Sequence, residues 1–418
     1  MPNAVPFITR VRIANYKSIR ACDISLGPLT FLIGTNGAGK TNFLDALAFV
    51  SQALATTPAQ AIHDRNGFDS IVHRFPQPAS QFSITLDAQV PTGLEGTKQA
   101  VARYGFEISR SNEPGERDFR VTREICRVRW PDDDRMIKES PESIFSVYDG
   151  QVEQYSSLPI GERTVEPDRL FLPLAAAQPS FAPLFVRLRD MFFYSFELRS
   201  LRATDRESAG PLGPYGEHLG DILVRLRRDH PEVLDRFNEY MKAIVPSYHS
   251  MYRRLDQMLT TVELHTQETF ATDQSGFGPQ DISDGTLRAA GVLAALFQPD
   301  VLDARTSLIG MEDPEIALHP SATGALFDAM KEASRWVQIV ATTHSGDLLD
   351  RDDIDVSSIR SALYENGETA IGEIDEASKQ SLHDRLFTPG ELLRADQLTP
   401  DADARQTAQV SNFDAFGD

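Results

Sequence analysis

The stretch "GTNGAGKT", residues 34–41, decides the expected fold of this chain. It fits the pattern G-x-x-x-x-G-K-[ST] position by position. The residues before it, "LTFLI" (29–33), read as a buried strand, and the residues after it, "TNFLDALAFVSQAL" (41–54), place apolar side chains at helical spacing. A glycine loop between a strand and a helix is typical of phosphate-binding loops. We therefore predict an α/β fold built around a P-loop.

The predicted loop has the residue types that hold a nucleoside triphosphate. Its glycines let the backbone wrap closely and aim N–H groups at phosphate oxygens, and the helix N-terminus adds its positive end. Lys40 is expected to reach the β- and γ-phosphates, and Thr41 to offer its hydroxyl to Mg²⁺. The sequence therefore predicts ATP and Mg²⁺ as cofactors. The predicted nucleotide-binding residues of this loop are Gly34, Asn36, Gly37, Ala38, Gly39, Lys40, Thr41 and Asn42.

Two later apolar runs end in polar side chains that complement the loop. "SLIGM" (307–311) leads into Glu312 and Asp313, as expected for the second strand that brings a carboxylate to magnesium. Mg²⁺ keeps several waters and takes one or two carboxylates, so one acid can serve the metal while the next polarises the attacking water. "ATTHS" (341–345) follows another apolar run, and His344 is expected to hydrogen-bond to the γ-phosphate from that strand end.

The segment "ISDGTLR" (282–288) puts small polar residues just before the apolar helix pattern "LRAAGVLAALF". A helix N-terminus of this kind is suited to phosphate. By itself the segment also reads as an ordinary helix cap, with Ser283 or Asp284 as the N-cap.

Composition and charge restrict the class of protein. The chain has 418 residues and a formal net charge of -20 at pH 7, which disfavours wrapping of DNA around the whole surface. The longest apolar run, "AAGVLAALF", is too short to cross a bilayer, and the first ten residues lack the order of a signal peptide. Cys22 and Cys126 match no zinc spacing. We expect a cytoplasmic protein with no membrane partner.

Five motifs, taken in order, resemble those of the ABC-type ATPases of the RecF, SMC and OLD group, often described as stand-alone AAA-family ATPases. The resemblance runs from about residue 8 to 395. The motifs are "YKSIR", "GTNGAGKTNFLDAL", "ISDGTLR", "MEDPEIALHP" and "ATTHS".

The resemblance implies a head-to-tail nucleotide sandwich of two protomers. In that family "SDGT" looks like the signature loop, which binds the γ-phosphate of ATP held by the other subunit. Ser283 and Gly285 would make these contacts, with Asp284 between them in the nucleotide-binding set. The resemblance also implies roles for the later motifs. Thr41 and Glu312 are the metal ligands, Asp313 is the general base, and His344 is the switch histidine.

The acidic motif departs from the commoner order of Asp followed by Glu. Here Glu312 precedes Asp313, and an Asp base is shorter than Glu by one carbon–carbon bond, roughly 1.5 Å. A positioned base is worth about 10²- to 10⁴-fold in rate. The expected outcomes are slow hydrolysis or replacement of Asp313 by Glu315 as the catalytic base. The glutamine that usually follows the first lobe also stays open among three candidates, Gln52, Gln60 and Gln81.

The periodicity and the resemblance together predict an ABC-type ATPase head with an antiparallel β-subdomain and a helical insertion. Alternating apolar residues in "FSITLDAQV", "RYGFEISR" and "FRVTREICRV" predict the antiparallel strands. We expect residues 1–160 to form the N-terminal half of the head, 161–260 the helical insertion, and 261–395 the C-terminal half. The polar, acidic residues 396–418 are expected to be disordered.

The predicted function is an ATP-hydrolysing dimeric switch. The resemblance implies DNA repair or anti-phage defence as its setting. It also implies a separate nuclease or effector chain as partner, because too few residues follow "ATTHS" for the TOPRIM nuclease domain that OLD proteins carry. The alternatives are a nucleotide-binding subunit of an ABC transporter and an SMC-like DNA clamp. The first is disfavoured by "SDGT" in place of "SGGQ", and the second by the prolines that break the insertion.

DNA is a further expected partner, through arginines clustered near the insertion. The competing interpretation is that they form salt bridges on helix surfaces. The arginines are Arg187, Arg189, Arg199, Arg202, Arg206, Arg225, Arg227, Arg228, Arg253 and Arg254.

Overall fold

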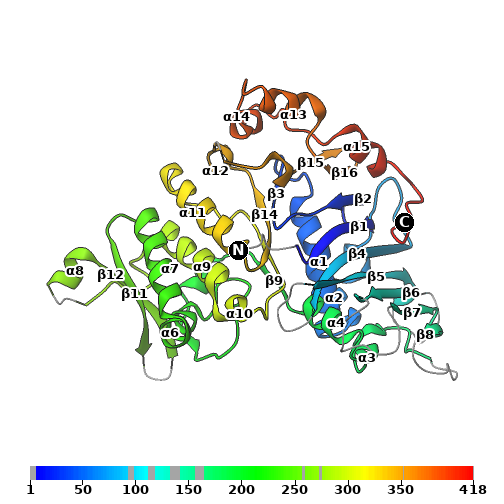
Figure 1. Ribbon diagram of the computed structural model, residues 1–418, viewed down its shortest axis with the longest axis horizontal. Coiled ribbons are helices and arrows are strands. Elements are labelled where there is room, and N and C mark those ends of the chain that lie inside the picture. The colour runs from blue at the N-terminus through cyan, green and yellow to red at the C-terminus, as the bar shows by residue number, and fades with distance from the viewer. Residues whose placement is uncertain are drawn as a thin grey trace.

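The computed structural model shows two lobes joined by a central sheet (Figure 1). It describes residues 6–92, 98–111, 118–131, 142–155, 164–256, 259–272, 275–351 and 353–417. Three β-sheets of two or more named strands lie within these ranges. No helix in the described part of the chain combines the length and the apolar composition that a membrane crossing requires.

The central sheet has six strands in the order β16-β15-β3-β14-β13-β9. All neighbouring pairs are parallel except β15 with β16, which form an antiparallel pair at one edge. The carboxyl ends of the five parallel strands therefore meet at one edge of the sheet. The strands are β3 (Leu29–Ile33), β9 (Met191–Tyr194), β13 (Leu308–Met311), β14 (Gln338–Thr343), β15 (Ile359–Glu365) and β16 (Glu368–Gly372).

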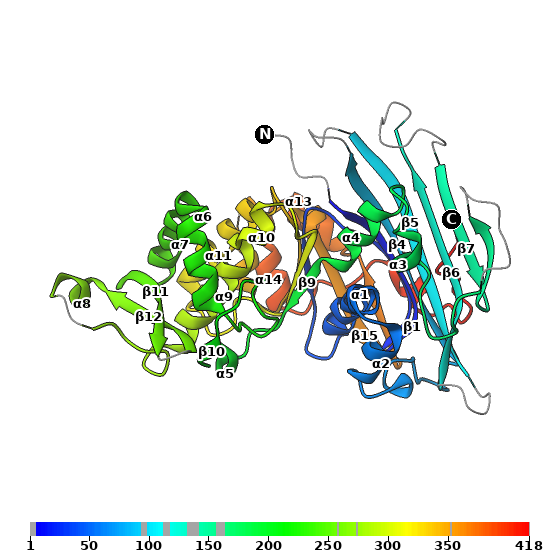
Figure 2. The ribbon, with the colours of Figure 1, turned by 90° about the horizontal axis from the view of Figure 1, so that it is seen from below.

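Both faces of the central sheet are covered, which explains why its inner strands read as continuous apolar runs. Successive side chains of a strand point to opposite faces. In β3, Leu32 belongs to the core that contains α1, whereas Phe31 and Ile33 belong to the core on the other side. Figure 2 shows the resulting layers, from the helices of one lobe through the central strands and α1 to the antiparallel sheet.

The first lobe is an antiparallel sheet packed on α1 (Lys40–Ala55). Its strand order is β2-β1-β4-β5-β6-β7-β8. Alternate residues such as Phe82, Ile84 and Phe106 point into the core with Phe43 and Phe49 of α1. The predicted antiparallel strands are confirmed. They are β1 (Ile8–Tyr16), β2 (Ile19–Ser25), β4 (Gln81–Thr92), β5 (Lys98–Arg110), β6 (Phe119–Arg129), β7 (Glu142–Tyr148) and β8 (Gln151–Tyr155).

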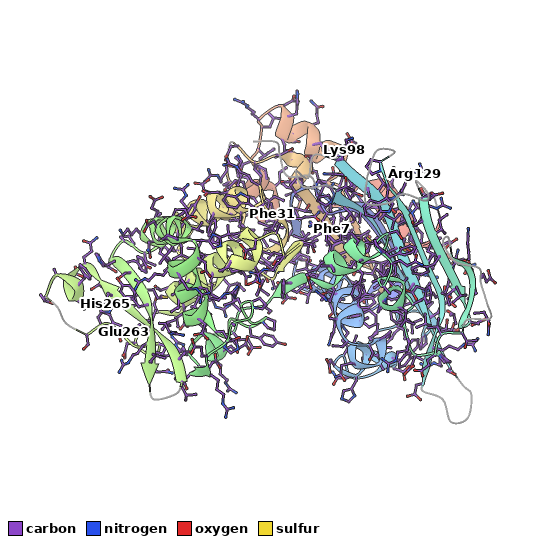
Figure 3. The ribbon with its side chains drawn as sticks, turned by 60° about the horizontal axis from the view of Figure 1, so that its bottom comes forward. Phe7, Phe31, Lys98, Arg129, Glu263 and His265 are labelled. Carbon is purple, nitrogen blue, oxygen red and sulfur yellow. The ribbon has the colours of Figure 1, made fainter. Side chains whose placement is uncertain are left out.

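The second lobe packs helices against the other face of the central sheet and extends them with a three-stranded sheet, β10-β12-β11. Figure 3 labels Glu263 and His265 on this distal sheet, and Phe31 near the junction of the lobes. The elements of this lobe are α5 (Leu198–Leu201), β10 (Asp205–Arg206), α6 (Leu219–Asp229), α7 (Pro231–Ile244), β11 (Tyr248–Asp256), β12 (Leu259–Thr266), α8 (Gln267–Ala271), α9 (Asp284–Phe297), α10 (Pro299–Leu302) and α11 (Pro320–Ala333).

The segment 161–260, expected as one helical insertion, is divided between both lobes. Its first helices, α3 (Leu172–Ala175) and α4 (Ala182–Arg189), lie on the side of the first lobe, where α4 contacts α1. The apolar run of β9 then joins the edge of the central sheet beside β13. Only the part after β9 builds the second lobe, and that part includes strands as well as helices. The sequence of β9 shows a short apolar run, but such a run does not reveal which sheet the strand will join.

The expectation of a disordered tail at 396–418 is corrected by the structure for residues 396–417. Asp401 caps α15 (Ala402–Ala408), and Ala415 and Phe416 are buried. The tail is ordered because α15 packs on β16 and β2 and because the side chains of Ala415 and Phe416 are buried. The remaining elements are α2 (Pro58–His63), α12 (Gly346–Leu349), α13 (Glu376–His383), α14 (Pro389–Arg394) and two short 3-10 turns at Phe68–Ser70 and Val356–Ser358.

Candidate nucleotide site

The P-loop connects the carboxyl end of β3 to the start of α1. Gly34, Gly37 and Gly39 have φ values of 141°, 79° and 98°, which side-chain-bearing residues rarely adopt. A Cβ on Gly34 would lie 2.2 Å from the carbonyl oxygen of Ala362, and one on Gly39 would lie 2.4 Å from Oγ1 of Thr369. The glycines are therefore required both by the turn and by the close approach of β15 and β16.

Lys40 is buried, and its ammonium lies over the loop. Its Nζ donates to the carbonyl oxygens of Gly34 at 2.9 Å and Thr35 at 3.0 Å. Burial lowers the pKa of Lys40, while the negative charges of Asp313 and Glu315 act in the opposite direction. The cation is thus placed between the loop and the acids that the sequence predicted.

The structure separates Asn42 from the rest of the predicted loop set. Its Nδ2 donates to Oγ of Ser18 at 2.7 Å, and Oγ1 of Thr369 donates to the same oxygen at 2.7 Å. Asn42 therefore ties α1 to the "YKSIR" turn and to β16. The tip residues Asn36 and Gly37 are exposed, whereas Ala38 is buried and donates its N–H to Thr35.

Glu312 follows β13 and meets Thr41, the other predicted metal ligand. Its Oε2 accepts a hydrogen bond from Oγ of Ser195 at 3.1 Å. Burial raises the pKa of Glu312, the charge of Asp313 raises it further, and hydrogen bonds from Ser195 and Thr41 oppose the rise. Carboxylate and hydroxyl oxygens are the ligands that Mg²⁺ prefers, so this pair fits a magnesium site.

Asp313 is held in an uncommon backbone conformation. Its φ is 40°, and its N–H donates to Oγ1 of Thr342 at 3.0 Å, while the same hydroxyl donates to Asp313 Oδ1 at 3.2 Å. The side chain remains 23% exposed, so its carboxylate is accessible from the site. Thr342 thus fixes both the backbone and the carboxylate of Asp313.

Glu315 lies deeper than Asp313. Its Oε1 accepts from Oγ1 of Thr343 at 2.6 Å and from the backbone N–H of His344 at 3.2 Å. Its Oε2 is buried and has no hydrogen-bond partner within the described residues. Burial, the largest effect, raises the pKa of Glu315. This carboxylate therefore braces the end of β14.

His344 links the P-loop to the acids. Its Nδ1 lies 3.5 Å from Nζ of Lys40, and its Nε2 lies 3.8 Å from Oδ1 of Asp313. Burial lowers the pKa of His344, Lys40 lowers it further, and Asp313 opposes the change. The imidazole is therefore neutral at pH 7. One ring nitrogen then carries a proton and donates a hydrogen bond, and the other accepts a hydrogen bond.

The segment 283–285 lies at the start of α9, apart from this cluster. Ser283 is the N-cap and accepts the N–H of Thr286 at 3.3 Å. A Cβ on Gly285 would lie 2.4 Å from the carbonyl oxygen of Ala317, so the helix start packs closely on the loop after Glu315. Asp284 pairs with Arg202 at 2.7 Å. Among the residues that the structure describes, no hydrogen bond joins this segment to the P-loop.

Comparison with known proteins agrees with this geometry. A family model described as "AAA domain, putative AbiEii toxin, Type IV TA system" matches residues 29–351, from β3 to the segment after His344. The chain belongs to this AAA_21 family. The resemblance to the stand-alone AAA-family ATPases of the RecF group is thereby confirmed. The strand order and the helices confirm the α/β fold with a large antiparallel sheet.

Curated relatives match this AAA_21 protein over a short stretch. A "DNA replication and repair protein RecF" of Vibrio vulnificus (strain YJ016) is 49% identical over 41 residues, which are 10% of this chain and 11% of that protein. RecF of Porphyromonas gingivalis (strain ATCC BAA-308 / W83) is 51% identical over 45 residues, 10% of this chain and 12% of that protein. The match therefore spans about a tenth of the length of these curated relatives.

Among solved structures, the SMC head bound to the C-winged helix domain of ScpA has 16% identity and a TM-score of 0.49, with 90% of this chain and 100% of that chain covered. The SMC head domain from Thermotoga maritima has 13% identity and a TM-score of 0.39, with 88% and 99% covered.

Sequence reasoning missed three residues of the AAA_21 site, Ser195, Thr342 and Thr343. Ser195 directly follows β9, and the apolar run "MFFY" before it is a signal that identifies a strand end. The two threonines lie within the quoted motif "ATTHS". Their roles follow only from contacts along the fold, of Thr342 with Asp313, 29 residues away in sequence, and of Thr343 with Glu315, 28 residues away.

Most of the arginines that suggested DNA contact are engaged within the protein. Arg187 is half-buried, and its guanidinium lies 4.9 Å from the ring centre of Phe7. Four others form ion pairs, which are Arg202 with Asp284, Arg225 with Asp300, Arg228 with Asp229, and Arg253 with Asp221. These contacts agree with the salt-bridge interpretation.

Proposed function

We propose that this chain binds ATP with Mg²⁺, hydrolyses it, and acts as a switch that two protomers form head to tail. One observation carries the proposal. Three neighbouring parallel strands, β3, β14 and β13, bring Lys40, His344 and Asp313 to one edge of the sheet, where His344 lies 3.5 Å from the Lys40 ammonium and 3.8 Å from the Asp313 carboxylate. A P-loop cation, a neutral imidazole and an accessible carboxylate at one point are the groups that γ-phosphate hydrolysis requires.

Each of these groups has a specific task in the proposed reaction. The glycine loop and Lys40 hold the phosphates, and Thr41 with Glu312 holds Mg²⁺, which neutralises phosphate charge when bound. Asp313 accepts the proton of the attacking water. The neutral imidazole of His344 donates a hydrogen bond to the γ-phosphate.

Asp313 is a better candidate for the base than Glu315. Both oxygens of Asp313 belong to a partly exposed side chain, and its partner Thr342 holds one of them. Glu315 is buried, and its Oε1 already accepts two hydrogen bonds from the end of β14. A base must reach the water from which it takes the proton. Glu315 therefore positions Thr343 and His344 while Asp313 faces the reaction.

The dimeric part of the proposal rests on the position of Ser283 and Gly285. They lie at the N-terminus of α9, a 14-residue helix whose positive end suits a phosphate. Within the described residues they make no hydrogen bond to their own P-loop. A second protomer turned head to tail would bring its ATP to this helix start. We therefore assign the segment 283–285 to the γ-phosphate of the partner protomer.

The biological setting that we propose is DNA repair or anti-phage defence, with control of a separate nuclease or effector chain. The description of the family as a toxin in a type IV toxin–antitoxin system supports a defence setting, and the RecF name of the curated relatives supports a DNA repair setting. DNA itself is proposed as a partner of the assembly.

The test of hydrolysis compares Asp313→Asn, Glu315→Gln and Lys40→Ala in the full chain. Asp313→Asn should lower kcat for ATP hydrolysis by about 10²- to 10⁴-fold while ATP binding is retained, because the amide cannot accept the water proton. Lys40→Ala should weaken ATP binding itself. Glu315→Gln keeps an acceptor for Thr343 and should have the smaller effect. Normal turnover in Asp313→Asn together with loss in Glu315→Gln would show that the base is Glu315.

The test of the sandwich is sedimentation of Asp313→Asn with and without ATP and Mg²⁺. ATP should shift this slow variant from monomer to dimer, and Ser283→Arg in the same background should abolish the shift by filling the space of the partner's phosphate. A dimer that forms equally with Ser283→Arg would rule out this interface.

A further inference from the structure

The last seven described residues, 411–417, cross the outer face of the antiparallel sheet. We name this segment the C-terminal strap. The outer face is the side opposite to the core residues Phe82 and Phe106, and Figures 1 and 2 both place the C-terminal coil beside this sheet. The sequence of the strap, "SNFDAFG", contains two phenylalanines and an aspartate.

The strap is held by contacts that recognise a backbone, a ring and a carboxylate. Nη1 of Arg12 donates to the carbonyl oxygen of Gly417 at 2.9 Å. The guanidinium of Arg123 lies 4.0 Å from the ring centre of Phe416 and 3.8 Å from Oδ1 of Asp414. Phe416 is only 7% exposed.

Gly105 of β5 forms the floor beneath the phenylalanine. A Cβ at this position would lie 3.1 Å from Cε1 of Phe416 and 2.3 Å from Oγ1 of Thr85. Glycine within a strand weakens it and often marks a close approach of another group. The missing side chain therefore leaves space for the ring on the outer face of the sheet.

The strap lies between two cavities. Beyond Phe416 a cavity of about 620 Å³ continues along β5 to β8, with Arg103, Arg127 and Tyr148 in its walls. On the other side of the strap a cavity of about 660 Å³ is lined by Asn15, His73 and Gln77 among others. Each volume is in the range of a ligand pocket.

The cavity lined by Asn15 and Gln77 also contains the buried side chain of His73. Nδ1 of His73 lies 2.8 Å from the carbonyl oxygen of Lys17, so this nitrogen carries the proton. His73 is buried, and its Nε2 has no partner in the part of the chain that the structure describes. Nε2 is then an acceptor that a peptide N–H or a side-chain donor can satisfy.

The cavity along β5 to β8 is lined by arginines and by apolar side chains. Asp87 is shared between Arg12 and Arg103, and Glu142 between Arg127 and Arg129. Val101 beside them is 58% exposed. Figure 3 labels Arg129 on this sheet.

We propose that the outer face of the antiparallel sheet is a docking groove for an acidic, phenylalanine-bearing peptide of a partner protein, and that the C-terminal strap occupies this groove in cis. The seated strap shows which chemistry fits. A ring enters the space above Gly105, a carboxylate pairs with Arg123, and a peptide carbonyl accepts from Arg12. The two cavities leave room for a longer peptide than the strap. A tethered segment competes at an effective concentration in the millimolar range, so a partner must bind by displacing it.

The experiment uses the labelled octapeptide SNFDAFGD, residues 411–418, and fluorescence anisotropy. A variant ending at Val410 should bind the peptide saturably, whereas the full chain should bind it at least about tenfold more weakly because the tethered copy competes. The same peptide with Phe416→Ala should lose binding. Equal binding by the two proteins, or none by the shortened one, would overturn the proposal.

A second variant keeps the chain at full length. Asp414→Lys combined with Phe416→Ala should release the strap and restore binding of the added peptide. Adding Arg123→Ala should remove that binding, while Arg335→Ala, an exposed arginine on the other lobe, should leave it unchanged. Melting temperatures of all variants check folding. Binding of a labelled 20-base single strand of DNA without binding of the peptide would also overturn the proposal, because the face would then serve nucleic acid.

Discussion

Ser195 and Glu312 show how one unrecognised side chain tunes a site. The hydroxyl of Ser195 donates to Oε2 of Glu312, and this bond opposes the rise in the pKa of Glu312 that burial causes. The hydroxyl therefore favours the ionised form of Glu312, against the effect of burial. Ser195 is a positioning residue in the proposed metal site.

Ser195→Ala should weaken the use of Mg²⁺ without removing ATP binding. A hydrogen bond to a charged group contributes about 1.5 to 3 kcal/mol, so the Mg²⁺ concentration for half-maximal hydrolysis should rise about tenfold or more. The pKa of Glu312 should rise as well, which moves the acid limb of the pH profile to higher pH. Magnesium titrations at several pH values measure both effects. Ser200→Ala, on the neighbouring short helix α5, is the matched control and should change neither value.

The start of α3 shows how a buried charge joins two elements. Glu124 of β6 is fully buried and accepts hydrogen bonds from the N–H groups of Phe171 and Leu172 and from the hydroxyl of Tyr104. A carboxylate at a helix start satisfies N–H groups that have no partner within the helix. Burial nevertheless raises the pKa of Glu124 to about 7, against these hydrogen bonds.

The raised pKa of Glu124 predicts a specific pH dependence of stability. Between the unfolded value of 4.5 and about 7 the native protein holds a proton that the unfolded chain releases. The free energy of unfolding should therefore fall as pH rises through this window, by about 3 kcal/mol in total. Glu124→Gln keeps the shape and removes the titration. Urea unfolding of both proteins from pH 4.5 to 8 should show a steeper fall in the wild type. Parallel curves would contradict the assignment.

Gln338 connects the central sheet to the antiparallel sheet of the first lobe. It begins β14 of the central sheet and is only 4% exposed. Its Oε1 accepts the N–H of Ile8 at 2.8 Å, and its Nε2 donates to the carbonyl oxygens of Ile8 at 2.8 Å and Gly27 at 2.9 Å. One amide thus satisfies the start of β1 and the turn before β3. This side chain therefore fixes the position of the antiparallel sheet relative to the central sheet.

Gln338→Ala should lower the free energy of unfolding strongly. A buried polar group left without a partner costs about 1 to 3 kcal/mol. Gln338→Ala leaves three backbone groups without their hydrogen bonds, so the free energy of unfolding should fall by about 3 kcal/mol or more. Urea unfolding measures it. Gln409→Ala, an exposed residue after α15, should leave the unfolding free energy within about 0.5 kcal/mol of the wild-type value. A small loss for Gln338→Ala would mean that the layers are joined elsewhere.

The sequence by itself determined the local parts of this protein. The spacing of glycines around Lys40, the apolar run before Glu312 and the alternation in β4 to β6 are properties of consecutive residues, and each predicted its own element. The sequence predicts Asp313 and His344 as site residues for the same reason, since each lies within two residues of the end of a buried strand.

Only the tertiary structure decided which of these parts meet. The position of β14 between β3 and β13, the hydroxyl of Ser195 on Glu312, and the seat of Phe416 above Gly105 all join residues far apart in sequence. An apolar strand carries no record of the neighbour it will pair with, because backbone hydrogen bonds and burial are nearly the same for many partners. For the same reason the sequence predicts a helical insertion where β9 lies and disorder where the C-terminal strap lies.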